Sequence, residues 1–326
     1  MSQTVKTRVV GVDIGVEFTT YAIVDIRGMI IADDRIRTAD YPNVNEFVNV
    51  LSEKIVTIVE ANGGYETVRS VGISAPSGNF LTGCIENAGN MPWKGVVPLA
   101  AMLRDRLGLA VALGNDAHVT AIGENIYGSA HGMKDFIVVS LGHGGVGSCF
   151  FSQGRPHLGA NGSAGEVGHI CVADGGRRCG CGRMGCLEEY ASKRGIAQTA
   201  REVMAESDGP SLLRSLDELT PAAIGACCDQ GDEMALEVYR RTGEMLGIGL
   251  STYASVLNPE AIILTGELTP AWKWLEEPTQ QSFDEHVFPN IRGKVPMMVS
   301  IIKDSERDVV GASALAWEVE EYSLFK

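Results

Sequence analysis

A strand, a glycine-bearing turn and a second strand follow one another twice in this chain, and this repeat limits the possible folds most strongly. The first copy, RVVGVDIGVEFTTYAIVD, covers residues 8–25, and the second, FIVVSLGHGGVGSCFF, covers residues 136–151. A pattern that returns after about 130 residues indicates two similarly built halves. With 326 residues the chain is also too long for one ordinary domain. We therefore predict two α/β domains around a cleft, each offering a glycine-rich turn to it.

The remaining elements alternate between strands and amphipathic helices. Apolar residues at helical spacing run through residues 43–61 and stop at Asn62-Gly63-Gly64. The other expected elements are strands at MIIADDRI, TVRSVGISAP, AVALG, AIILTG and MMVSII, and helices over residues 96–107, 115–126, 231–257 and 306–321. We expect residues 1–116 together with 305–326 to form the first domain, and residues 117–304, with the cysteine-rich loop, to form the second.

The charge of the chain argues against several classes of partner. Its 41 acidic residues against 27 Lys and Arg give a net charge of −14, whereas binding to phosphate backbones requires concentrated Lys and Arg. We therefore expect neither nucleic acid nor a membrane as a partner, and no apolar run approaches the length of a membrane span. The opening MSQTVKTR lacks the apolar core of a signal peptide, and eight cysteines in such a chain suggest thiols and metal ligands. We expect a cytoplasmic location.

Three cysteines and one histidine are spaced as ligands of a structural metal. Cys179, Cys181 and Cys186 follow C-x-C-x4-C, and His169 precedes them. Three thiolates and one imidazole form a closed tetrahedral zinc site, and the glycines of GGRRCGCGRMGC let the backbone fold around an ion. The alternatives are a loop of reduced thiols and a redox centre. A redox centre is disfavoured because the C-x-C segment does not begin a helix after a strand.

Two carboxylates accompany this loop. Glu166 is three residues before His169, and Glu188 is two residues after Cys186, so a loop folded onto zinc brings both acids to one place. Carboxylates that converge with an imidazole suit hydrogen bonding to neighbouring hydroxyl groups. The alternative for Glu188 and its neighbour Glu189 is a place in the first turn of a helix, where the helix dipole favours acids.

Taken together, these segments resemble the ROK family of repressors, open reading frames and sugar kinases. G-E-x-G-H followed by C-x-C-G-x-x-G-C-L-E is the family signature, present here at residues 165–169 and 179–188 without a mismatch. The resemblance spans the chain, through VVGVDIG, GISAPSGNFLTGCIENAGNMPWKG, NDAHVTAIGE, PEAIILTGEL and KDSERDVVGASALAWEV. It implies an actin-like ATPase fold and ATP-dependent phosphorylation of a hexose, usually at the 6-hydroxyl. The segment GISAPSGNFLTGCIENAGNMPWKG resembles the bacterial glucokinase branch of the family in particular. This resemblance makes glucose the first candidate substrate.

The resemblance also implies roles for single residues. Asp116 would be the general base that accepts the proton of the attacking hydroxyl, with an N-cap acid as the alternative interpretation. The sugar hydroxyls would be held by Gly78, Asn79, Asn115, Glu166, His169 and Glu188. ATP phosphates and Mg²⁺ would face Asp13, Gly15, Gly142, Gly144 and Gly266, because glycine allows close approach of backbone N–H groups. His169 would also bind the structural zinc through its second ring nitrogen.

The departures from the family pattern lie in the nucleotide half. Val16-Glu17 replaces the usual Gly-Thr, His143 stands in the L-G-T-G turn, and Glu267 stands in the G-G-G turn. Val16 adds a side chain where a phosphate needs bare backbone, and Glu17 adds negative charge beside a polyphosphate.

These departures leave two functions open. The first is a hexokinase, and the second is a non-catalytic sugar-binding sensor with an impaired ATP site. A DNA-binding repressor is disfavoured, since no helix-turn-helix segment precedes the first strand of this acidic chain. The sequence does not determine which hexose is the substrate. A homodimer is expected only because members of the family are usually dimers.

Overall fold

The structure, a computed structural model, describes residues 6–142 and 145–319 and divides the chain into two compact units. Unit 1 holds the residues up to 132, residues 159–162 and those from 301 onward, and unit 2 holds residues 133–158 and 163–300.

Helix α3 (Asp116–Tyr127) belongs to unit 1, where it packs against α9 (Arg307–Glu318). Glycines allow this contact, since a Cβ at Gly123 would lie 2.9 Å from the Cα of Gly311. The predicted domain boundary at residue 116 would place most of α3 in the second domain, whereas the division into units places it in unit 1. The boundary at residue 116 stays a prediction.

Five strands form the main sheet of unit 1, in the order β3-β2-β1-β4-β8. They are β1 (Arg8–Ile14), β2 (Phe18–Asp25), β3 (Ile30–Arg37), β4 (Val68–Ser74) and β8 (Ala110–Gly114). A small second sheet contains β5 (Gly78–Asn79), β6 (Cys84–Glu86) and β7 (Val96–Val97). Strands β1, β4 and β8 are parallel, and their register pairs Asp13 with Ser74 and Ser74 with Gly114. The carboxyl ends of these three strands therefore share one edge of the sheet.

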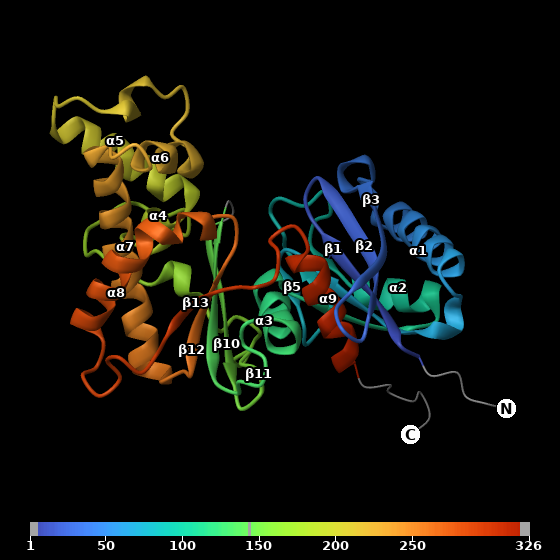
Figure 1. The fold of residues 1–326 in the computed structure, drawn as a ribbon. Helices are drawn as coiled ribbons and strands as arrows, with labels where there is room; N and C mark the ends of the chain where they lie inside the picture. The colour runs from blue at the N-terminus through green and yellow to red at the C-terminus, as the bar shows by residue number, and fades with distance from the viewer. Residues whose placement is uncertain (1–5, 143–144, 320–326) are drawn as a thin grey trace. The chain divides into compact units, whose positions relative to one another are not determined.

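Helices cover both faces of this sheet (Figure 1). Helices α1 (Val44–Ala61) and α2 (Leu99–Leu107) lie on one face, where Phe47 and Leu51 are fully buried. Helices α3 and α9 lie on the other face. Helix α9 rests directly on strand backbone, because a Cβ at Gly72 would lie only 1.9 Å from the carbonyl oxygen of Ala312. The apolar residues of the sheet and the two helix layers form the core of unit 1.

Unit 2 has its own five-stranded sheet in the order β11-β10-β9-β12-β13. Its strands are β9 (Phe136–Gly142), β10 (Gly145–Ser152), β11 (Arg155–Pro156), β12 (Ala261–Thr265) and β13 (Met297–Val299). Its helices are α4 (Glu188–Ala191), α5 (Lys193–Glu206), α6 (Pro221–Cys228), α7 (Glu233–Leu257) and α8 (Trp272–His286). Short 3-10 segments of the chain cover Thr38–Asp40, Tyr65–Thr67, Val167–His169, Leu212–Ser215 and Thr269–Ala271. The core of unit 2 joins α5, α6, α7 and α8 to β9 and β12.

The predicted repeat is confirmed by the two sheets. In unit 1, β1 pairs antiparallel with β2 and parallel with β4, and in unit 2, β9 pairs antiparallel with β10 and parallel with β12. The long helix expected at residues 231–257 is α7, which begins after its N-cap Asp232. The helix expected from residue 96 begins later, at Leu99, because Val96 and Val97 pair with β6.

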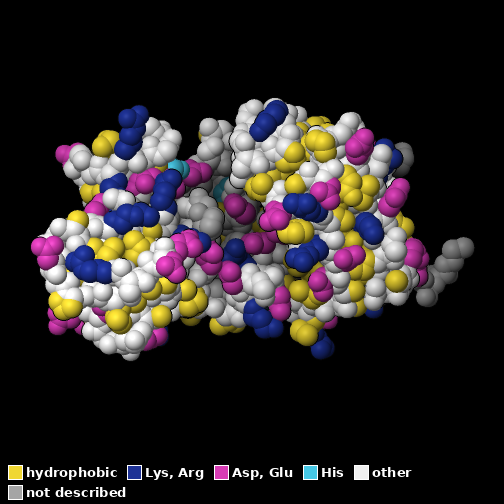
Figure 2. All heavy atoms as spheres, turned by 90° about the horizontal axis from the view of Figure 1, so that it is seen from above, with side chains coloured by type: hydrophobic (Ala, Val, Ile, Leu, Met, Phe, Trp, Pro, Cys, Tyr) yellow, Lys and Arg dark blue, Asp and Glu magenta, His cyan; other side chains and the backbone are white. Residues whose placement is uncertain are grey.

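Among the described residues, no helix is both long and apolar enough to cross a membrane. On the face shown in Figure 2, Lys and Arg side chains occur in small groups separated by acids. The visible surface therefore presents no extended basic field of the kind that phosphate backbones require.

Candidate functional site

The predicted metal ligands of unit 2 come together. One ligand atom each from His169, Cys179, Cys181 and Cys186 lies within 4.8 Å of the other three. The Nδ1 of His169 is 3.6 Å from the Sγ of Cys179, and the Sγ atoms of Cys181 and Cys186 are 3.7 Å apart. Sulfur ligands at the usual zinc distance of about 2.3 Å lie about 3.8 Å from one another in a tetrahedral site. The four residues therefore fit one zinc ion.

The loop that carries these thiols is held by its own backbone. The N–H of Cys179 donates to the carbonyl of Arg183 at 2.9 Å, and that of Gly182 donates to Cys179 at 2.9 Å. Gly185 has a φ of +73°, and a Cβ there would lie 1.8 Å from the carbonyl oxygen of Ala173. This turn therefore requires glycine, as the sequence pattern indicated.

The thiols differ in how readily they ionise. Burial raises the pKa of Cys179 and Cys186, whereas the backbone N–H of Arg183 lowers the pKa of Cys181. A zinc ion would supply the positive charge that keeps all three as thiolates, and its binding would release protons.

Glu188 lies directly beside this cluster. Its Oε1 accepts from the Sγ of Cys179 at 3.1 Å and is 3.8 Å from the Nδ1 of His169. Its other oxygen lies against the start of β10, since a Cβ at Gly145 would be 2.6 Å from it. Helix α4 has only four residues, so its dipole gives little reason for an acid at its first position. The contact with the cluster is the stronger explanation of this carboxylate.

The structure brings His169 and Glu188 together, while Glu166 is exposed at the start of the 3-10 segment before His169. The charge of Glu166 contributes to the raised pKa of Tyr253 on α7, after the larger effect of burial. Glu166 is thus on the same unit as the cluster, with its carboxylate open to solvent.

In unit 1, Asn115 and Asp116 follow β8 at the edge where the parallel strands end. Asn115 is the N-cap of α3, and its Oδ1 accepts from the N–H of Ala117 at 2.9 Å. Asp116 is the first residue of the helix, is exposed, and also accepts from Ala117, at 2.8 Å. The cap position therefore belongs to Asn115, and Asp116 occupies the first turn of α3, where the helix dipole also favours an acid.

The loop with Gly78 and Asn79 packs on the same edge. A Cβ at Gly78 would lie 2.5 Å from the carbonyl oxygen of Gly114, directly before Asn115. The amide nitrogen of Asn79 donates to Glu86 at 3.2 Å, which fixes the orientation of the side chain.

Asp13 lies at the carboxyl end of β1, in a group of charged side chains that includes residues of α9. Burial is the main cause that raises its pKa, to about 7, and the charges of Asp308 and Asp116 act in the same direction. The hydroxyl of Ser74 and the charge of Arg307 oppose this shift. Burial and the two neighbouring acids therefore favour the protonated form of the Asp13 carboxyl more than in an exposed aspartate.

Ser74 and Arg307 complete this group. The Oγ of Ser74 is fully buried next to Asp13 but completes no hydrogen bond of normal geometry with the described residues. The guanidinium of Arg307 donates to Asp308 through Nε at 2.9 Å and Nη2 at 3.0 Å, and it also pairs with Asp304. Neither Arg307 nor Asp308 was predicted from the sequence, because an Arg-Asp pair at the start of a helix has many ordinary surface uses.

The other predicted nucleotide-side residues that the structure describes lie in turns or at the end of a strand. The N–H of Gly15 donates to the carbonyl of Phe18 at 2.9 Å, and the exposed Val16 follows it. In unit 2, Gly266 has a φ of +99°, and a Cβ there would lie 2.4 Å from the carbonyl oxygen of Leu141. Gly142 ends β9, and a Cβ there would lie 3.8 Å from the side chain of Glu267. Gly144 and His143 lie outside the described residues.

Comparison with known proteins gives consistent matches along the chain. A model of the ROK family matches residues 9–319. A glucokinase of Halalkalibacterium halodurans is 30% identical over 95% of this chain and 95% of its own length. Among solved structures, a ROK family glucokinase from Streptomyces griseus in complex with glucose and AMPPNP has a TM-score of 0.73 and 27% identity, over 96% of this chain and 100% of that one.

A regulator is also similar. The structure of a ROK family transcriptional regulator, a homologue of the E. coli MLC protein, has a TM-score of 0.84 and 25% identity, over 94% of this chain and 77% of that one. Together these likenesses confirm the predicted actin-like α/β fold, and they include both kinases and regulators.

Proposed function

This chain belongs to the ROK family, and from that membership we propose that it phosphorylates a hexose with ATP, with glucose as the first candidate and the 6-hydroxyl as the acceptor. The observation that carries the proposal is the position of Asp116. Its exposed carboxylate lies where β8 ends, beside Asp13, and Asn115 already occupies the helix cap.

In the proposed reaction, Asp116 accepts the proton of the sugar hydroxyl as the hydroxyl oxygen attacks the γ-phosphorus of ATP. The bond between that phosphorus and the β,γ-bridging oxygen breaks, and ADP leaves. Phosphoryl transfer needs little covalent chemistry from the protein, so the other residues position the reactants and offset their charge.

The proposed sugar contacts follow from the resemblance to the family. In unit 1, Asn115, Gly78 and Asn79 supply amide and backbone groups at the edge that carries Asp116. In unit 2, Glu166, His169 and Glu188 supply acceptors and an imidazole for vicinal hydroxyls.

The proposed cofactors are ATP, Mg²⁺ and a structural zinc. Asp13 offers Mg²⁺ a hard oxygen ligand, and the turns at Gly15, Gly142, Gly144 and Gly266 would face the phosphates. Mg²⁺ would neutralise charge on the phosphates, and zinc, held by His169 and the three cysteines, would fix the loop next to Glu188. A cytoplasmic location is part of the proposal and is supported by eight free cysteines. A homodimer is also part of the proposal, and light scattering would test it.

The alternative is a sugar-binding sensor without efficient phosphoryl transfer. Three observations favour it: the exposed side chain of Val16 after Gly15, the side chain of Glu267 next to Gly142, and the similarity to a ROK regulator. An ADP-release assay with MgATP across a panel of hexoses separates the two. A kinase releases ADP in proportion to one hexose, whereas a sensor binds a hexose in calorimetry and releases none. Failure to bind any hexose would contradict both functions.

A further inference from the structure

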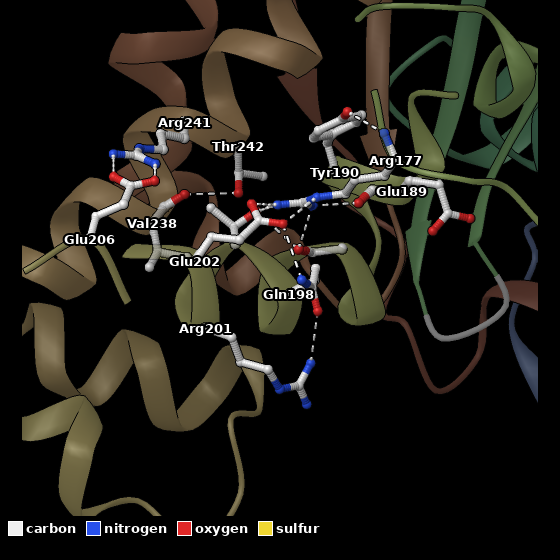
Figure 3. A network of polar contacts seen from close by, with 12 residues as sticks. Arg177, Glu189, Tyr190, Gln198, Arg201, Glu202, Glu206, Val238, Arg241 and Thr242 are labelled. Atoms are coloured by element: carbon white, nitrogen blue, oxygen red, sulfur yellow. Dashed lines mark hydrogen bonds and ion pairs between the residues drawn. The ribbon is translucent and has the colours of Figure 1, made fainter. Parts of the chain in front are cut away.

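Arg177, two residues before the first cysteine of the metal loop, uses every N–H donor of its side chain within the protein (Figure 3). Its Nε donates to Glu202 at 3.1 Å, and its Nη1 donates to the carbonyls of Glu189 at 2.6 Å and Gly195 at 3.1 Å. Its Nη2 donates to Thr199 at 2.8 Å and to the second oxygen of Glu202. A guanidinium has five N–H groups, and these five contacts satisfy them all.

Tyr190 adds two further contacts to the same arginine. The guanidinium carbon lies 4.5 Å from the centre of the Tyr190 ring, and the Tyr190 hydroxyl accepts from the backbone N–H of Arg177 at 3.0 Å. A Cβ at the preceding Gly176 would lie 2.3 Å from that hydroxyl, so the close approach depends on glycine. The loop and helix α4 are therefore joined through both the side chain and the backbone of Arg177.

The contacts of Arg177 lie after Glu188 in the chain, on helices α4 and α5. The carbonyl of Glu189 and the ring of Tyr190 belong to α4, which Glu188 begins, and Gly195 lies in the first turn of α5. The predicted metal ligands lie before Glu188, the last of them, Cys186, only two residues away. Two separate attachments thus act on the segment that carries Glu188.

We infer that Arg177 is a positioning residue that fixes Glu188 for hexose binding, and that it does so independently of the metal. The link to hexose binding rests on the proposed function of Glu188. The guanidinium fork, rather than a positive charge alone, is required, because its planar geometry reaches a carboxylate and two carbonyls together.

The charge of Glu202 supports this arrangement from the α5 side. Burial alone would raise its pKa, but its hydrogen bond to Arg177 lowers the pKa overall. The hydrogen bond to Arg177 therefore favours the carboxylate form of Glu202, and removing either partner leaves the other without its counter-charge.

The test compares Arg177→Gln with Arg178→Gln. Arg178 is the next residue and is exposed, so the second variant makes the same change outside the network. Isothermal calorimetry should show hexose binding weakened by about tenfold or more in Arg177→Gln and by less than about twofold in Arg178→Gln. Elemental analysis should find the wild-type amount of zinc in both variants. Arg177→Lys, which keeps the charge, should behave like Arg177→Gln.

A second readout needs no ligand. Amide hydrogen exchange should be faster in Arg177→Gln for Tyr190 and Ala191, whose N–H groups bond to Leu187 at 2.9 and 3.0 Å. If the wild type binds no hexose, the proposed function fails, while this exchange still tests the positioning role.

Three outcomes would overturn the inference. They are wild-type exchange in α4 of Arg177→Gln, wild-type hexose affinity in that variant, and loss of zinc in step with loss of affinity. If Arg177→Gln does not fold, Glu202→Gln and Arg177→Lys carry the same test, and wild-type exchange and affinity in both would also refute it.

Discussion

Replacing Asp13 with asparagine should remove a pH dependence from the stability of this protein. The groups that face Asp13 are Ser74 on β4, Asp116 on α3, and Arg307 and Asp308 on α9. Burial raises the pKa of its carboxyl from 3.8 to about 7, with the two neighbouring acids acting in the same direction. In the unfolded chain the same carboxyl ionises near its ordinary pKa.

The sign follows from proton binding. Between pH 4 and pH 7 the folded state holds a proton on Asp13 that the unfolded state has released, so the free energy of unfolding falls as the pH rises. The contribution is complete below the unfolded pKa and is lost as the pH passes the folded one. A difference of about 3 pKa units at 1.36 kcal/mol each gives at most about 4 kcal/mol.

Urea unfolding of wild type and Asp13→Asn at pH 4.5, 6, 7 and 8 measures this effect. The variant should gain stability relative to wild type as the pH rises, by about 2 to 4 kcal/mol between the two ends. Titrating groups that do not interact with Asp13, including the thiol cluster, cancel in the difference. Asp105→Asn is a matched control because Asp105 is 70% exposed. Parallel stability curves for wild type and Asp13→Asn would refute the reasoning.

Four further predictions concern the metal, the base, the nucleotide side and one turn. Protein purified without added metal should contain one zinc per chain and lose it in Cys181→Ser, and a metal-free protein that binds sugar normally would contradict this. Asp116→Asn should abolish turnover and leave hexose affinity within about tenfold, because the loss falls on the transition state; more than a few per cent residual turnover would rule Asp116 out as the base. MgATP should bind more tightly when hexose is present, and the double variant Val16→Gly with Glu17→Thr should change the Michaelis constant for ATP only modestly. Sugar binding without saturable ATP binding would instead favour the sensor. In a sensor, the same double variant should raise the activity from near zero. Gly266→Ala should lower the free energy of unfolding by about 1 to 3 kcal/mol, because the new Cβ would lie 2.4 Å from a carbonyl oxygen of β9, and an unchanged denaturation midpoint would argue against this.

The sequence predicted best what depends on local spacing. Cys179, Cys181 and Cys186 lie in one short loop, so their convergence needs only a tight turn, and the structure shows it. The strand repeat could be predicted equally well, because each copy is one short segment of the sequence that buries apolar residues. The roles of the single site residues remain predictions.

The sequence could not predict contacts between segments that are far apart in the chain. It also could not predict which of two adjacent residues of the same type would be buried. Arg307 is next to Asp13 only because α9 returns to the first sheet. Arg177 and Arg178 are adjacent residues of the same type, yet all five side-chain N–H groups of Arg177 form hydrogen bonds whereas Arg178 is exposed. Which of two such residues faces inward is decided by the tertiary fold.

The contact of α9 with the sheet of unit 1 has a consequence for synthesis on the ribosome. Strands β1 and β4 leave the ribosome early, but the helix that covers one of their faces is translated only after all of unit 2. The glycine positions at which α9 touches strand backbone, such as Gly72, therefore stay uncovered while most of the chain is made. Unit 2 is nearly continuous in sequence. We expect it to fold first in the nascent chain, with unit 1 completed after α9 emerges.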